Sequence, residues 1–286
     1  MPGLVVVDKP SGMTSHDVVS RGRRLLGTRK VGHAGTLDPM ATGVLVLGVG
    51  RATRLLGHLT LTDKAYDATI RLGASTTTDD AEGEVTATAD TSGLDPADVE
   101  RALERFVGDI EQVPTSVSAV KVEGKRAYQR VREGEEVRLD ARPVTVHELT
   151  LHEQRPGERF ELDVSLRCSS GTYVRAIARD LGAALGVGGH LTALRRTAVG
   201  PFGLDRARTL DDLAEDPVVV PLAEAAREGF AAVDLDDAQA RDVGFGRPLD
   251  LRLEGLSALF APDGTFLALY RPDPAGGARP VAVFVG

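Results

Sequence analysis

One carboxylate, Asp38, lies in a segment whose composition fixes its position, VGHAGTLDPMATGVLVLGVGRATR (31–54). Gly35 permits a sharp turn before it, and Pro39 restricts the backbone after it. The apolar run 44–49 predicts a strand that anchors the segment in a sheet. A carboxylate on such a rigid loop can act as a nucleophile or stabilise an electron-poor carbon. In isolation, an Asp before Pro is more often a turn residue that bonds to its own backbone.

The segment resembles the G-H-x-G-x-L-D-P-x-A-x-G signature of TruB-type tRNA pseudouridine synthases. Eight positions carry the match: Gly32, His33, Gly35, Leu37, Asp38, Pro39, Ala41 and Gly43. Other segments resemble the family in the same order along the chain: Asp8-Lys9-Pro10 with Thr14-Ser15, Lys64-Ala65-Tyr66, Ser118-Ala119 and Gly171-Thr172-Tyr173-Val174-Arg175. The resemblance covers roughly residues 4 to 201, with a departure at Thr115-Ser116, where many relatives have a second Pro and a hydrophobic residue.

This resemblance implies that the chain isomerises the T-loop uridine of tRNA, at position 55, to pseudouridine. It gives Asp38 the role of catalytic carboxylate and Arg175 that of its charged partner. Tyr66 would stack on the flipped-out uracil, and Tyr173 would lie in the same pocket. Because no external atom enters the product, we expect no cofactor, and the scattered His residues suggest no metal.

The residues themselves give a reason for the Arg175 assignment. A carboxylate in a pocket dry enough for a base needs a positive neighbour to stay ionised. If residues 171–175 are extended, the two-residue period places Tyr173 and Arg175 on one face. The alternatives are an ordinary surface Arg at a helix start and, for Tyr66, a half-buried packing residue.

The resemblance also implies RNA contacts outside this group. His33 would enter the T-loop and fill the space left by the flipped nucleotide, while Lys9 and Leu194 match family residues near the pocket. A further set is basic and is predicted to contact phosphates: Lys121, Lys125, Arg126, Arg130, Arg132, Arg195 and Arg196. For any one of these, an ordinary charged surface residue is an equally good interpretation.

Composition permits RNA binding without suggesting it. The 286 residues carry a net charge of −8, whereas a nucleic-acid protein usually presents a basic face. The charges are segregated, however, because residues 1–60 hold eight Lys or Arg against three Asp, and residues 76–112 hold eleven acids against two Arg. The acidic run is typical of a solvated outer surface.

The chain has a single cysteine, Cys168, and its N-terminus shows no targeting segment, which favours a cytoplasmic protein. Because it has no apolar stretch of about 20 residues, we expect no contact with a membrane. The resemblance suggests a monomer whose partner is the tRNA T stem-loop, with no obligate protein partner.

Periodicity predicts an α+β fold, and the resemblance makes it the pseudouridine synthase fold, a mixed and largely antiparallel sheet flanked by helices. We expect a strand at 4–7, a helix capped by Ser15, a strand at 64–72, a surface loop at 75–84, a helix from Asp95-Pro96 and a hairpin of 144–151 with 160–168. A helix at 209–215 and short strands at 249–253, 257–261, 265–270 and 280–285 follow. These predict a catalytic domain at 1–228, with a basic projecting loop around 115–142, and a β-rich PUA-like domain at 229–286 that binds RNA or is only a structural cap.

Two other functions fit parts of the sequence. Gly43–Gly50, GVLVLGVG, is glycine-rich, but its spacing matches neither a dinucleotide-binding motif nor a P-loop. A non-catalytic tRNA-binding or tRNA-folding protein on the same scaffold is the stronger alternative, since binding requires the basic surface but not Asp38. The presence of Asp38, Tyr66, Tyr173 and Arg175 together favours the enzyme.

Overall fold

A computed structural model describes residues 2–116, 121–122, 125–126 and 139–285. By its contacts the chain divides into two compact units. Unit 1 comprises Met1–Asp38, Val44–Thr60 and Gly200–Gly286, and unit 2 comprises Pro39–Gly43 and Leu61–Val199. Within the described residues, no helix is both long enough and apolar enough to span a membrane.

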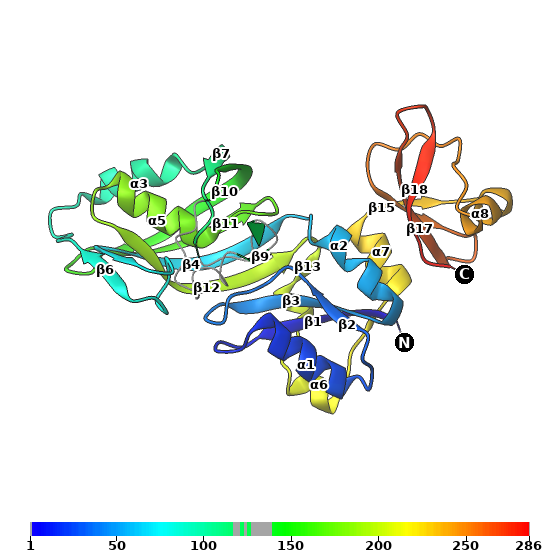
Figure 1. Ribbon diagram of the computed structural model, residues 1–286, viewed down its shortest axis with the longest axis horizontal. Helices are drawn as coiled ribbons and strands as arrows, with labels where there is room; N and C mark the ends of the chain where they lie inside the picture. The colour runs from blue at the N-terminus through cyan, green and yellow to red at the C-terminus, as the bar shows by residue number, and fades with distance from the viewer. Residues whose placement is uncertain (1, 117–120, 123–124, 127–138, 286) are drawn as a thin grey trace. The chain divides into compact units, whose positions relative to one another are not determined.

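Unit 2 is built on an antiparallel sheet with the strand order β12-β4-β11-β10-β7, against which helices α3 and α5 pack (Figure 1). A small hairpin of β5 and β6 accompanies it. The elements are β4 (Lys64–Leu72), β5 (Ala74–Thr76), β6 (Val85–Thr88), α3 (Pro96–Glu104), β7 (Gly108–Gln112), β8 (Lys121–Val122), β9 (Lys125–Arg126), β10 (Arg142–Arg155), β11 (Glu161–Cys168), α5 (Val174–Ala184) and β12 (Gly189–Val199). Burial alternates from residue to residue along β4, so Tyr66, Ala68 and Ile70 lie on its buried face.

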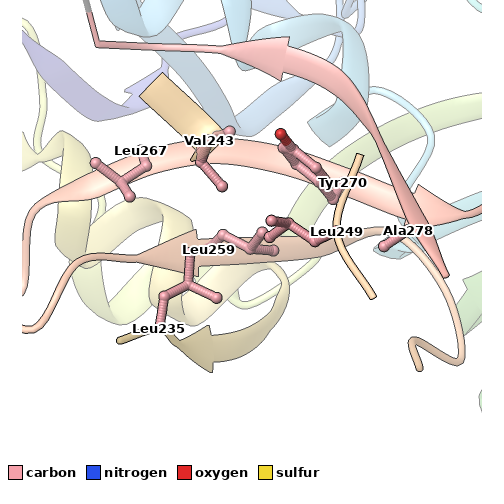
Figure 2. Close-up of a cluster of buried hydrophobic side chains, with 8 residues drawn as sticks. Leu235, Val243, Leu249, Leu259, Leu267, Tyr270 and Ala278 are labelled. Carbon is pink, nitrogen blue, oxygen red and sulfur yellow. The ribbon is translucent and has the colours of Figure 1, made fainter. Parts of the chain in front are cut away.

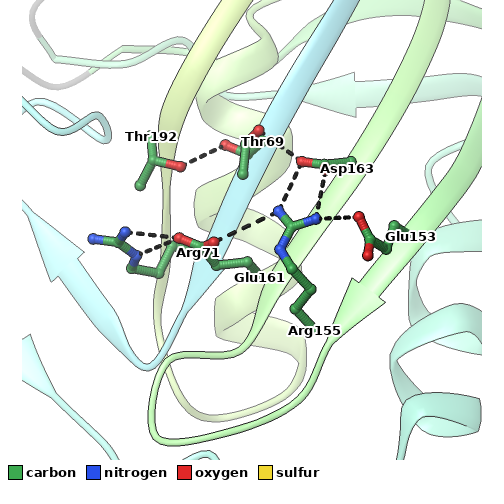
Figure 3. A network of polar contacts seen from close by, with 7 residues as sticks. All are labelled: Thr69, Arg71, Glu153, Arg155, Glu161, Asp163 and Thr192. Atoms are coloured by element: carbon green, nitrogen blue, oxygen red, sulfur yellow. Dashed lines mark hydrogen bonds and ion pairs between the residues drawn. The ribbon is translucent and has the colours of Figure 1, made fainter.

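A polar network joins three neighbouring strands of unit 2 (Figure 3). Arg155 of β10 lies 2.5 Å from Asp163 of β11 and 2.6 Å from Glu153, and Asp163 accepts a hydrogen bond from Thr69 of β4 at 2.7 Å. The hydrogen bonds from Arg155 lower the pKa of the Asp163 carboxyl. Because the Arg155 and Asp163 side chains are about a third exposed and that of Glu153 is 61% exposed, water screens the attraction and the network adds little stability.

Unit 1 holds β1 between β14 and β3, with β2 antiparallel to β3. Helices α1 and α2 pack on β2, and α7 packs on β1. Its elements before residue 230 are β1 (Gly3–Lys9), α1 (Ser15–Leu25), β2 (Val31–Ala34), β3 (Thr42–Val49), the 3-10 helix η1 (Gly50–Arg54), α2 (Leu56–Leu59), β13 (Phe202–Gly203), η2 (Leu204–Arg206), α6 (Asp212–Glu215), β14 (Val220–Pro221) and α7 (Leu222–Gly229). The apolar runs Leu4–Val7 and Val44–Leu47 are at most 3% exposed and form the core of this sheet.

The C-terminal part of unit 1 has a four-stranded sheet in the order β15-β16-β17-β18. Its elements are β15 (Ala231–Asp234), α8 (Asp237–Gly244), β16 (Ser257–Phe260), β17 (Phe266–Pro272) and β18 (Ala278–Val283). Its core contains buried side chains that include Leu235, Val243, Leu259 and Tyr270 (Figure 2). The buried phenol of Tyr270 donates a hydrogen bond to the Arg247 carbonyl at 2.7 Å, which satisfies its polar end.

The predicted fold class is confirmed as an α+β fold with a mixed, largely antiparallel sheet and a small β-rich C-terminal part. The sheet β15–β18 lies within the predicted domain 229–286, although contacts group it with unit 1, and the boundary at 228 stays a prediction. Strand β4 and the β10–β11 hairpin lie where the sequence placed them.

Several local predictions are wrong. Thr14, not Ser15, caps α1, because its side chain and that of Asp17 exchange hydrogen bonds with each other's backbone N–H. Residues 249–253 form no strand, and only Leu249 makes a bridge, to Ala278. Strand β15 and helix α8 were not expected.

The single cysteine provides a test of packing in unit 2. Cys168 is 1% exposed on β11, and burial raises the pKa of its thiol to about 11. We expect labelling by a chromogenic disulfide reagent at pH 8 to be at least ~100-fold slower in the native than in the denatured protein, because the thiol is both inaccessible and protonated. Equal labelling rates, followed by absorbance, would contradict this packing.

Candidate active site

The backbone before Asp38 is held on both sides of a turn. Strand β2 ends at Ala34, which still pairs with β3, and Gly35 then turns the chain with a φ of 82°. Beyond the turn, the hydroxyl of Ser15 donates a hydrogen bond to the Leu37 carbonyl at 3.1 Å and accepts one from the Leu37 N–H at 2.9 Å. Asp38 itself is partly exposed, so this loop offers a carboxylate from a fixed backbone.

The motif glycine after Asp38 is required by close packing of two strands. Thr42 and Gly43 pair in parallel with Arg195 and Arg196 of β12, which makes the sheet mixed. Gly43 has a φ of 95°, and a Cβ added there would lie 2.2 Å from the Arg196 carbonyl oxygen. Any other residue at 43 would therefore separate β3 from β12.

His33 lies in strand β2, where it pairs with Leu47 of β3. Its ring meets that of His16 of α1 edge-on, with centroids 5.6 Å apart and planes at 80°. His16 is exposed and His33 partly exposed, so this pair of imidazoles lies at the surface of unit 1.

Four predicted site residues lie on adjacent strands of unit 2. Tyr66 is 9% exposed on β4 and is paired with Arg196, while Leu194 of β12 is 8% exposed. Arg195 is partly exposed and donates a hydrogen bond to the Thr42 hydroxyl at 3.3 Å. Arg196 is only 1% exposed, which places its side chain inside the unit and not on the surface expected of a phosphate contact.

Lys64 carries a buried ammonium on the same face of β4 as Tyr66. It is 6% exposed, and its Nζ donates a hydrogen bond to the Thr62 carbonyl at 2.6 Å. Burial, and after it the nearby Arg196 guanidinium, lowers the pKa of the Lys64 ammonium to about 8. The charge of this group thus changes within the slightly alkaline range.

The start of helix α5 corrects the prediction of an extended segment at 171–175. Tyr173 is the N-cap residue and α5 begins at Val174, so Tyr173 and Arg175 are not related by strand alternation. Gln112, a residue that sequence reasoning missed, holds this start: its amide oxygen accepts a hydrogen bond from the Tyr173 N–H at 2.7 Å, and its amide nitrogen donates one to the Tyr173 carbonyl at 3.1 Å. Gln112 is 2% exposed and fixes the backbone of the N-cap residue Tyr173, whose own side chain makes no capping hydrogen bond.

Arg175 lies beside a carboxylate that the sequence did not single out. Its Nη1 is 3.3 Å from Oδ2 of Asp80 and donates a hydrogen bond to the Thr78 carbonyl at 2.8 Å. The two charged side chains are 6% and 3% exposed. Asp80 also accepts hydrogen bonds from the Thr78 hydroxyl and the Glu82 N–H. Such a paired and hydrogen-bonded carboxylate allows a guanidinium to stay charged inside a protein.

The loop 77–84 lies largely at the surface, as expected, but its Asp80 is turned inward and buried. Asp79 has a φ of 59°, the one positive value among the described residues other than glycine. Its carbonyl accepts a hydrogen bond from the Leu191 N–H at 3.1 Å, and its carboxylate lies 3.4 Å from Arg179. Burial raises the pKa of the Asp79 carboxyl, while the guanidiniums of Arg179 and then Arg175 oppose that rise. Contacts on both sides therefore hold a backbone geometry that costs of order 1 kcal/mol.

Lys9 is fully buried, so it does not present its ammonium at the surface. Its Nζ donates hydrogen bonds to the Pro10 carbonyl at 2.9 Å and the Met13 carbonyl at 2.7 Å. These bonds shape the loop that leads into α1, and we assign Lys9 a structural role there.

The remaining predicted phosphate contacts belong to the loop around 115–142, which falls largely outside the described residues. Lys121 pairs with Arg126, and Lys125 with Val122, in the two-residue strands β8 and β9, but their side chains are not described. Arg130 and Arg132 lie outside the described residues altogether.

The candidate catalytic residues come from both units, with Asp38 in unit 1 and Tyr66, Tyr173 and Arg175 in unit 2. The residues that each unit supplies are held by contacts within that unit. That Asp38 lies beside the three residues of unit 2 remains a prediction. Across residues 2–285, apart from 117–120, 123–124 and 127–138, no cluster of His, Cys, Asp and Glu is placed to hold a metal ion.

Family models match the chain almost from end to end. The model described as the N-terminal domain of TruB family pseudouridylate synthases matches residues 23–174. The C-terminal domain of tRNA pseudouridylate synthase B matches 175–224, and the C-terminal model of tRNA pseudouridine synthase II matches 230–285. The chain belongs to the TruB family of pseudouridylate synthases. The predicted family and enzyme class, an isomerase, are thereby confirmed.

Curated relatives of this TruB-family chain are similar over their full length. A protein of Nocardia farcinica is 59% identical over 286 residues, covering 99% of this chain and 92% of the relative. A protein of Thermobifida fusca is 57% identical over 290 residues, covering 99% of each. One from Arthrobacter sp. is 54% identical over 297 residues, with 99% and 97% covered. All three are named tRNA pseudouridine synthase B.

Solved structures confirm the pseudouridine synthase fold of the TruB-family chain. A chain in the crystal structure of a Cbf5–Nop10–Gar1 complex superposes with a TM-score of 0.77 at 25% identity, covering 99% of this chain and 85% of that one. A chain of the archaeal box H/ACA Nop10–Cbf5 complex gives 0.72 at 24% identity, with 99% and 86% covered.

Sequence reasoning missed three polar side chains next to the candidate residues of this TruB-family site. Ser15 carried a signal, because it belongs to the matched Thr14-Ser15 motif, but it was interpreted as a helix cap. Asp80 stood within an acidic stretch, and Gln112 ends a strand; neither has a local pattern that points to its distant partner.

The buried pair predicts a stability effect in the TruB-family fold. Replacing Asp80 with Ala removes this carboxylate from beside the buried Arg175 guanidinium, which should lower the free energy of unfolding by about 3 kcal/mol. Urea unfolding followed by circular dichroism measures this change. As a control, Asp98→Ala removes an exposed ion pair with Arg101 and should change stability by less than about 0.5 kcal/mol. Equal stability of the two variants would contradict the importance of the buried pair.

Proposed function

We propose that this TruB-family enzyme isomerises the T-loop uridine of tRNA, position 55, to pseudouridine in the cytoplasm. The observation that carries the proposal is the match with relatives named tRNA pseudouridine synthase B, at 54% to 59% identity over 99% of this chain. Because these matches run through nearly the whole of both partners, they support a common class of RNA substrate as well as a common fold.

The reaction rearranges one nucleotide. The C1′–N1 glycosidic bond breaks, the uracil turns and C5 bonds to the same C1′; C5 then loses its proton to water, and N1 takes up a proton from water, so the product is an isomer of the substrate. Asp38 is the proposed carboxylate that attacks C1′ or stabilises the electron-poor sugar. No atom from a further reactant enters the product.

Several features of the two units support this assignment. The Ser15 hydrogen bonds fix the backbone beside Asp38, and Asp80 fixes the orientation of the Arg175 guanidinium. In the proposed complex Arg175 faces the Asp38 carboxylate and favours its ionised form. Tyr66 offers a flat ring for the flipped uracil, and Tyr173 lines the pocket beside it.

The proposed RNA footprint combines two partly exposed members of the predicted set with the basic residues around 121–132. His33 and Arg195 are partly exposed and can contact the T-loop and its phosphates. Lys121, Lys125, Arg126, Arg130 and Arg132 complete the footprint as proposed phosphate contacts. We leave out Arg196 and Lys9, because their side chains are 1% and 0% exposed.

Replacing Asp38 with Asn tests the catalytic assignment. The amide keeps the size of the side chain but cannot act as the nucleophile, so we expect turnover to fall at least about 1,000-fold while affinity for tRNA changes less than ~3-fold. Tritium release from a T stem-loop labelled at C5 of uridine measures turnover, and filter binding measures affinity.

The matched control is Asp67→Asn, an exposed Asp next to Tyr66 on β4, which should retain full activity. Normal tritium release by Asp38→Asn would remove Asp38 from catalysis. Tight binding without tritium release by the unchanged protein would instead favour a tRNA-folding protein.

Salt tests the basic footprint. Since each neutralised phosphate releases counterions, the logarithm of the tRNA dissociation constant should rise linearly with the logarithm of salt concentration between roughly 50 and 200 mM. Replacing Lys121, Lys125 and Arg126 with Gln should reduce this slope, whereas Arg101→Gln, on exposed α3, should leave it unchanged. Identical slopes for both variants would argue against phosphate contacts at 121–126.

A further inference from the structure

We propose that Ser15 is a positioning residue for this reaction, because its hydroxyl fixes the backbone at Leu37 and so aims the adjacent Asp38 carboxylate. The inference rests on the proposed catalytic role of Asp38. In this proposal Ser15 contacts no reacting atom and affects the reaction by holding the loop that carries Asp38.

The contact between Ser15 and Leu37 is unusually restrictive for one hydroxyl. The same oxygen accepts the Leu37 N–H at 2.9 Å and donates to the Leu37 carbonyl at 3.1 Å. A serine hydroxyl has one donor hydrogen, and here that hydrogen is directed at a single backbone residue. Ser15 is 1% exposed and Leu37 3% exposed, so water does not compete for these bonds.

Ser15 is itself held by the start of helix α1. Thr14 and Asp17 form a capping box around it, which fixes the first turn. Val18 and Val19 of the same helix are buried at 0% and 4% exposure and attach it to the core of unit 1. The hydroxyl therefore connects the Asp38 loop to a rigid element 22 residues earlier in the chain.

The loop needs such an attachment because sheet pairing stops before it. The β2–β3 ladder ends at Ala34, and Gly35 follows with a φ of 82°, a residue that restricts the backbone little. Leu37, which the Ser15 hydroxyl holds, stands directly before the carboxylate. Since a displacement of about 1 Å at a reacting group can cost ~100-fold in rate, the two hydrogen bonds should be visible in catalysis.

The test compares Ser15→Ala with Ser20→Ala, which changes an exposed serine of the same helix, in single-turnover tritium release with the enzyme in excess over the labelled T stem-loop. We expect Ser15→Ala to lower the saturating rate constant by about 10- to 100-fold while the dissociation constant stays within ~2-fold. Ser20→Ala removes an exposed hydroxyl from the same helix but neither the cap nor the bonds to Leu37, and should keep the rate constant within ~2-fold. Because unfolded enzyme does not contribute at saturation, a purely structural role would leave both rate constants unchanged.

Two results separate the inference from the function on which it rests. A normal rate for Ser15→Ala, together with an inactive Asp38→Asn, would overturn the positioning role and leave the proposed function intact. An active Asp38→Asn would overturn the proposed function itself. If Ser15→Ala does not fold, Ser15→Cys, whose thiol makes weaker hydrogen bonds, should give an intermediate rate, and a normal rate there would equally overturn the inference.

Discussion

The ion pair between Arg175 and Asp80 is the interaction on which the candidate site of unit 2 depends. Taking a guanidinium out of water costs several kcal/mol, and here the cost is offset by a carboxylate at 3.3 Å and the Thr78 carbonyl at 2.8 Å. Both partners come from the loop 77–84, so that loop has to bring Asp80 and the Thr78 carbonyl to the guanidinium. Asp79 takes the left-handed conformation within it, and its carbonyl is held by Leu191 of β12.

In the same unit, two hydrogen bonds from a buried amide fix the backbone next to Arg175. The Gln112 side chain occupies both the N–H and the carbonyl of Tyr173, as Ser15 does for Leu37 in unit 1. In both cases a buried polar side chain from a distant part of the sequence fixes a backbone residue within two positions of a candidate catalytic side chain. Groups that must act at fixed positions are thus attached to helices and strands and not to loops alone.

Local signals in the sequence were sufficient for part of this structure. The alternation in β4 and the Asp95-Pro96 start of α3 are properties of a few neighbouring residues, and the structure has both. The family motif likewise located the Asp38 loop and the strand after it. Residues 171–175 were misjudged as extended because α5 begins without a side-chain cap, and the backbone at its start is fixed by Gln112, 61 residues away.

Long-range contacts explain the other differences. Asp80 lies in an acidic stretch, and no neighbouring residue indicates that it forms an ion pair with the buried Arg175, 95 residues later in the chain. The burial of Arg196 and Lys9 is also set by tertiary packing, since Lys and Arg are rarely buried and composition favours them at the surface. Ser15 was predicted to cap the helix that follows it, but its hydroxyl instead bonds to the backbone of Leu37, 22 residues later.

The sharpest test of catalysis by Asp38 is the distance between its carboxylate oxygen and C1′ of the target nucleotide. It can be measured in a crystal structure of the enzyme bound to a T stem-loop that carries an unreactive uridine analogue. We predict about 3 to 3.5 Å, the separation of groups poised to react, with the Arg175 guanidinium next to the carboxylate. A nucleotide stacked on Tyr66 with the Asp38 carboxylate more than about 6 Å from C1′, too far for attack, would contradict it.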